Sequence, residues 1–103
     1  MLFRSEVAKG ELQNKNYEAA IIGARKVLAA LSAEEQKKLG LEGWDMLGRA
    51  YAFSDRHLEA TIALTTGLER FGNNDKEKAS DVADALDRTV TLLKKNKIGR
   101  AHV

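Results

Sequence analysis

The sequence predicts an all-α fold, and three observations lead to that prediction. The chain of 103 residues has no proline and is rich in alanine, leucine, lysine and glutamate, which suits long helices. No stretch alternates apolar and polar residues in the manner of a strand, and apolar residues instead recur three and four positions apart. With 44% apolar residues, a chain of this length can form one small core.

Helical periodicity and turn signals predict five helices. They are expected over about residues 6–14, 17–31, 41–53, 56–71 and 75–96. Ser54 and Asp55 are suitable N-caps for the fourth helix, and Gly72 is a suitable end for it. Asn74 with Glu77 has the spacing of a cap for the fifth helix.

The stretch between the second and third helices allows two interpretations. Ser32 and Glu35 have the spacing of a capping box, so residues 33–40 either form a separate short helix or extend the next helix backwards. Gly40 and Gly43 each cost a helix about 1 kcal/mol relative to alanine, which favours a break between them. The sequence does not decide between the two.

The middle of the chain carries a spacing that is known from one repeat family. Its residues are Trp44, Leu47, Gly48, Tyr51, Ala60 and Leu64. They resemble the Trp-x2-Leu-Gly-x2-Tyr, Ala-x3-Phe pattern of the tetratricopeptide repeat, with leucine at the last position. The resemblance implies antiparallel helix pairs that stack into an α-solenoid with a concave, partner-binding surface. It also implies that the motif residues pack in the core, and that Gly48 lets the two helices of a repeat approach closely.

The resemblance extends more weakly to both sides of this motif. Tyr17 and Ala20 resemble the opening of the second helix in a first repeat, at about residues 6–31. The second repeat covers about 41–72, and the helix at 75–96 resembles a degenerate first helix or a capping helix. We therefore expect one repeat domain over residues 6–96. Because stable arrays usually need three repeats, the chain is expected to be a fragment of a longer protein.

Both ends of the chain are expected to be foreign to the domain. Residues 1–5 and 98–103 read as translations, in opposite orientations, of the common stem of a sequencing adapter, so 1–5 and 97–103 are interpreted as terminal scars. Removing Arg4 and Arg100 from the 17 basic residues leaves 15, equal to the 15 acidic ones. The net charge of +2 therefore gives no reason to expect a nucleic-acid partner.

The repeat resemblance also implies where a partner would bind. In the family, the first helix of each repeat lines the concave groove on the side away from its packing residues. Carried over by register, the groove residues are Lys9, Gln13, Asp45, Arg49, Phe53, Asp84 and Arg88. Phe53 is the expected anchor, because aromatic side chains dominate binding energy at interfaces. The alternative is that these residues are simply exposed.

The predicted function is binding of a protein or peptide, without catalysis, metal or cofactor. The chain has no cysteine, and His57 has no nucleophile or second histidine at a useful spacing, so it is expected to pack against a neighbouring helix. Asp81, Asp84 and Asp87 fan out around a helix and do not converge on a cation. No apolar run is long enough for a membrane span.

Three alternatives stay open from the sequence. The repeats could form an accessory domain of a larger enzyme or regulator, or bind RNA, which would need a basic inner face. The fragment could also self-associate through the exposed ends of its array. Chaperone-tail binding is disfavoured, because Met46 stands where that clamp has asparagine, and Glu77 and Asp81 stand where it needs basic side chains. The sequence does not indicate a compartment.

Overall fold

The computed structural model describes the backbone of residues 16–101 and the side chains of residues 16–95. This part contains four α-helices and one short 3-10 turn. They are α2 (Tyr17–Ala30), α3 (Ala33–Phe53), α4 (His57–Phe71), η1 (Gly72–Asn74) and α5 (Lys76–Ala101). The described residues form no strand, which confirms the all-α prediction. The helix predicted at residues 6–14 lies outside the described residues.

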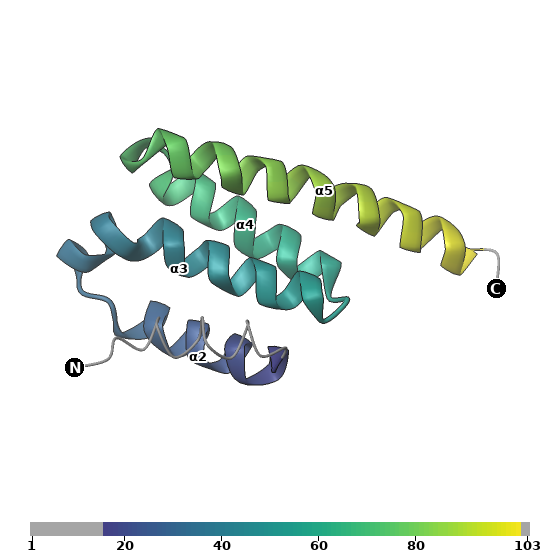
Figure 1. Cartoon of the computed structure of the whole chain (residues 1–103), viewed down its shortest axis with the longest axis horizontal. Coiled ribbons are helices and arrows are strands. Elements are labelled where there is room, and N and C mark those ends of the chain that lie inside the picture. Colours follow the sequence, from purple (N-terminus) through teal and green to yellow (C-terminus); the bar gives the residue numbers. More distant parts are fainter. Residues whose placement is uncertain (1–15, 102–103) are drawn as a thin grey trace.

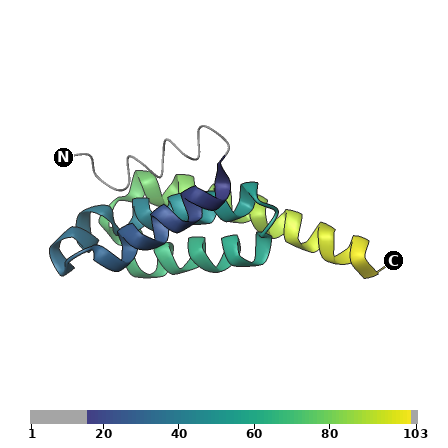
Figure 2. The ribbon, with the colours of Figure 1, turned by 90° about the horizontal axis from the view of Figure 1, so that it is seen from below.

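Consecutive helices run in opposite directions and pack side by side (Figure 1). α3 packs between α2 and α4, while α4 packs on both α3 and α5. α3 also contacts α5 directly, so these two helices share one side of the molecule. The C-terminal part of α5 extends beyond the other helices (Figure 2). α5 thus runs past the predicted end at residue 96.

α3 is a single helix that begins at residue 33, so the stretch 33–40 extends the next helix backwards. The capping box is present: the Ser32 hydroxyl accepts from the Glu35 amide at 3.2 Å, and the Glu35 carboxylate accepts from the Ser32 amide at 3.0 Å. The predicted break between Gly40 and Gly43 is wrong. A Cβ atom on Gly40 would lie 2.7 Å from the Phe71 ring, and one on Gly43 would lie 2.7 Å from Leu28. Tight packing on neighbouring helices thus offsets the poor helix propensity of both glycines.

The prediction that Ser54 and Asp55 cap α4 is wrong, because both residues belong to the end of α3. Asp55 has a φ of 62°, the left-handed conformation of a Schellman motif. The Arg56 amide donates to the Tyr51 carbonyl at 2.9 Å, and the Asp55 amide donates to the Ala52 carbonyl at 3.2 Å. α4 then starts after Arg56 without any side-chain cap.

α4 ends at Phe71 with Gly72 as its C-cap, as predicted, but the cap of α5 differs from the predicted one. Gly72 stays right-handed and continues into η1 before α5 begins at Lys76. Asp75 caps α5, since its carboxylate accepts from the Lys78 amide at 3.0 Å. The predicted cap residue Asn74 instead donates to the Lys37 carbonyl at 3.1 Å, which ties the turn to α3.

Two apolar clusters hold the helices together. The first joins α2, α3 and α4, and contains Ala20, Ile21, Ala24, Leu47, Ala50 and Ala63, with Leu28, Trp44 and Tyr51 against it. The second joins α3, α4 and α5, and contains Leu41, Leu64, Val82 and Ala85, with Leu68, Phe71, Ala79 and Leu86 against it. The first cluster packs α3 against both α2 and α4, and the second packs α4 against both α3 and α5. Each apolar cluster therefore needs three helices to form.

α3 and α4 approach each other closely at Gly48 and Ala60. Ala60 is fully buried, and a Cβ atom on Gly48 would lie 2.5 Å from Leu64 Cδ2 and 3.5 Å from the Ala60 carbonyl oxygen. This is the close approach expected at Gly48. Trp44 packs over Gly67 one turn away, with the Arg70 guanidinium 5.9 Å from its ring.

Candidate binding surfaces

A hollow of about 270 Å³ lies between α3 and α5 and is called here the α3–α5 hollow. Its lining residues are Arg49, Ala52, Phe53, Leu64, Ala85, Arg88, Thr89 and Leu92. Leu64 is buried, whereas Phe53 and Leu92 are 57% and 44% exposed. The hollow therefore combines an apolar floor with large apolar side chains that solvent can reach.

Tyr17 of α2 stacks on the Phe53 ring. The two rings stack with their centroids 5.5 Å apart and their planes 20° from parallel. Phe53 is the last residue of α3, and the Schellman turn directly after it fixes the path of the chain. A ring braced in this way loses little conformational entropy when a partner contacts it, which favours its use as an anchor.

Asp45 makes two ion pairs, one of which connects α3 to α5. Its side chain is buried, and its carboxylate lies 3.0 Å from Arg49 Nε on the same helix and 3.0 Å from Lys78 Nζ on α5. Both carboxylate oxygens are thus occupied by cations. Because a buried charge needs such partners, Asp45 contributes to the helix arrangement and Arg49 is partly neutralised.

The structure brings three of the seven predicted groove residues together. Arg49, Phe53 and Arg88 line the α3–α5 hollow. Asp45 is buried in its ion pairs, and Asp84 is exposed on α5 without lining the hollow. Lys9 and Gln13 lie outside the described residues.

Five further lining residues were not predicted for the groove: Ala52, Leu64, Ala85, Thr89 and Leu92. Leu92 follows Arg88 by four positions and so lies on the same face of α5. Continuing the groove register by one further turn would have found it. Ala52 carries no comparable signal, because its position next to the hollow depends on how closely α3 and α5 approach.

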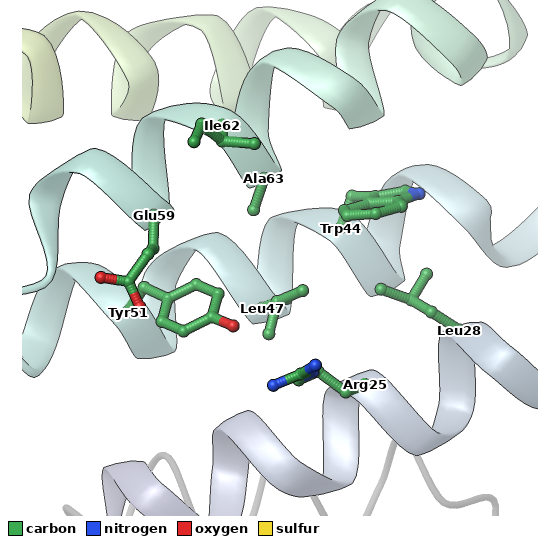
Figure 3. A pocket seen from close by; sticks show the side chains of 8 residues that line it. All are labelled: Arg25, Leu28, Trp44, Leu47, Tyr51, Glu59, Ile62 and Ala63. Carbon is green, nitrogen blue, oxygen red and sulfur yellow. The ribbon is translucent and has the colours of Figure 1, made fainter.

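A second hollow, of about 350 Å³, lies between α2 and α4 and is called the α2–α4 hollow (Figure 3). Its lining residues are Arg25, Leu28, Trp44, Leu47, Tyr51, Glu59, Ile62 and Ala63. The α3 side chains of this hollow lie between the two outer helices. Trp44 and Tyr51, predicted as core residues, are partly buried here and also reach this surface.

His57 is buried at the start of α4, as expected for a packed ring. Its Nε2 atom lies 3.7 Å from a carboxylate oxygen of Asp55, and its Nδ1 atom has no hydrogen-bond partner. Within the described residues, no three histidine, cysteine, aspartate or glutamate side chains gather closely enough to hold a metal ion. No described helix has the length and apolar character needed to cross a bilayer.

Comparison of the chain with models of protein families, with curated proteins and with solved structures finds no match. The repeat resemblance therefore rests on the residues of this chain alone, and so does the function inferred from it.

Proposed function

We propose that this chain is a helical-repeat module that binds a peptide or protein segment in the α3–α5 hollow. The observation that carries the proposal is the meeting of Arg49, Phe53 and Arg88 at one hollow. The repeat register predicts these residues on two separate helices, and random exposed residues would not be expected to converge. In a repeat array, this side would belong to the concave surface.

The lining of the hollow indicates the chemistry of the bound segment. The two arginines are its only charged lining residues, and Arg49 is already paired with Asp45. Arg88 is exposed and has no ion pair with a described residue. A segment with a carboxylate next to a large apolar side chain would satisfy Arg88 while packing on Phe53 and Leu64.

The proposal is tested by selecting binders from a displayed library of random peptides, with the full chain as bait. We expect the selected peptides to be enriched in an acidic residue beside a bulky apolar one. Phe53→Ala should weaken their binding by about 30-fold, corresponding to about 2 kcal/mol for an anchor residue. Binding affinities are measured by fluorescence anisotropy with labelled peptides.

Leu58→Ala is the matched control, because Leu58 is as exposed as Phe53, at 58% against 57%, but does not line the hollow. It should leave the affinity unchanged. Arg88→Ala should weaken acidic peptides more than neutral ones. The proposal fails if Phe53→Ala and Leu58→Ala change the peptide affinity equally. It also fails if single-stranded RNA binds at low salt and displaces the peptides.

A further inference from the structure

The α2–α4 hollow shares no lining residue with the α3–α5 hollow, and its edges carry exposed apolar side chains. Ile62 lines it from α4 and is 58% exposed. Leu58 lies one turn before Ile62, and Ile22 lies three residues before Arg25 on α2, so both flank the same hollow by helical spacing. Both are more than half exposed. Large aliphatic side chains gathered beside an apolar hollow mark an interaction surface.

Opposite charges stand on the two edges of this hollow. Arg25 comes from α2 and Glu59 from α4, with the side chains of α3 between them (Figure 3). Arg25 has no ion pair with any described residue. Glu59 has a long contact of 3.9 Å with Arg56, whose other nitrogen lies 3.3 Å from Glu18.

A surface with a cation on one edge and an anion on the other is complementary to itself. A two-fold axis that runs between the two edges of the hollow relates one copy to the other. Glu59 of each copy then faces Arg25 of its partner, so the same ion pair forms twice. The net charge of +2 imposes little repulsion between copies. These features point to the same chain as the occupant of the hollow.

We infer that two copies of this chain associate as a two-fold dimer through their α2–α4 hollows. Ile62 of each copy enters the hollow of the other and packs towards Trp44 and Leu47. Two symmetric ion pairs between Arg25 and Glu59 set the orientation. The contact uses a different surface from the proposed peptide site, so either can fail while the other holds.

The dimer is tested first by sedimentation velocity of the full chain over a concentration series. Wild type should shift from monomer to dimer as concentration rises, and Ile62→Glu should remain monomeric throughout. Leu92 is an exposed apolar residue in the other hollow, so Leu92→Glu should form the dimer over the same concentrations as wild type. A wild type that is monomeric up to its solubility limit overturns the inference, and so does a dimer that Leu92→Glu abolishes and Ile62→Glu does not.

Charge reversal tests the orientation of the two copies. Arg25→Glu and Glu59→Arg should each weaken the dimer by about tenfold, because each places like charges opposite one another. The double variant Arg25→Glu/Glu59→Arg should recover most of that loss. A double variant as weak as the singles would contradict the two-fold contact. Circular dichroism of each variant checks that these exposed substitutions leave the fold intact.

Disulfide trapping gives an independent readout, because the chain contains no cysteine. An equimolar mixture of Arg25→Cys and Glu59→Cys chains should form the mixed disulfide in excess over either symmetric one on mild oxidation. A mixture of Leu92→Cys and Glu59→Cys chains should show no such excess. Equal yields in both mixtures would mean that the chains meet only by random collision.

Discussion

The residue type at several helix positions of this protein depends more on the space around the position than on helix propensity. Gly40, Gly43 and Gly48 all lie within α3, where glycine costs a helix about 1 kcal/mol relative to alanine. At each, a Cβ atom would meet a side chain of another helix at less than 3 Å. The glycines are therefore contact points between helices. Asp55 also takes a conformation that is unfavourable for its residue type, because the chain must reverse direction between α3 and α4.

Gly48→Ala is expected to destabilise the fold by about 1–2 kcal/mol. The new methyl group would overlap Leu64, whose Cδ2 and Cγ atoms would lie 2.5 Å and 2.6 Å from it, so this almost fully buried side chain would have to leave its packed position. Overpacking of this kind costs about 1–3 kcal/mol, which exceeds the gain of up to about 1 kcal/mol in helix propensity. The free energy of unfolding is measured by urea denaturation followed by circular dichroism.

Gly72→Ala is the matched control for Gly48→Ala. Gly72 has a φ of −60°, and the nearest side-chain atom to an added Cβ would be 3.8 Å away. This change should be neutral or stabilise the protein by about 0.4–1 kcal/mol. If the two variants lose equal stability, the contact at Gly48 is not tight.

At the scale of the element, α3 depends on its capping box. The helix reaches back to Ala33 because Ser32 and Glu35 satisfy each other's backbone amides. The hydrogen bond from the Ser32 amide, followed by that from its hydroxyl, holds the pKa of Glu35 below its usual 4.5. A lowered pKa means that ionised Glu35 stabilises the folded state above the ordinary pKa of a glutamate. That contribution is lost as the pH falls through the lowered value.

Glu35→Gln is expected to lower the melting temperature at neutral pH but not in acid. At neutral pH the variant lacks the charged acceptor, whereas in acid the wild-type carboxyl is itself protonated and the two proteins become alike. The difference should therefore shrink as the pH falls below the usual pKa of a glutamate. Thermal unfolding of both proteins is followed from neutral to acidic pH.

Glu34→Gln serves as the control, because Glu34 lies in the same first turn outside the capping box. Its difference from wild type should report only the general effect of the helix dipole. A difference for Glu35→Gln that does not change with pH would show that the charge has no role in the cap.

At the scale of the whole molecule, the ion pair between Asp45 and Lys78 links α5 to α3. The apolar clusters attach α5 mainly through α4, whereas Lys78 contacts Asp45 directly across the α3–α5 side. This link lies on the side of the molecule that holds the proposed binding hollow. A change in it should therefore affect both stability and the shape of that hollow.

Asp45 and Lys78 are expected to be coupled by about 1–2 kcal/mol in a double-mutant cycle of Asp45→Asn and Lys78→Met. A fully buried pair would lose about 3–5 kcal/mol when one partner is removed, but the Lys78 side chain is 33% exposed, so solvent screens part of the interaction. Lys76→Met is the control on the same helix, since Lys76 is exposed. A coupling near zero would mean that the pair does not tie α5 to α3.

The candidate surface was only partly predictable from the sequence, for a physical reason. Arg49, Phe53 and Arg88 could be predicted because the repeat resemblance indicates which helix face lines the groove, and helical spacing assigns residues to that face. Leu92 follows from the same rule, taken one turn further. The burial of Asp45 could not be found, because it depends on Lys78, which is 33 positions away in sequence and adjacent only after α5 folds back.

From the sequence, short-range spacing and local hydrogen bonds predicted the helices of the described region and the capping box at Ser32, whereas the close contact at Gly48 was predicted from the repeat resemblance. The tertiary structure alone decided that α3 is continuous, where the turns close, and which side chains gather at the two hollows. Those features depend on the distances between helices. Such distances follow from how complete side chains pack across several elements, and no local pattern encodes them.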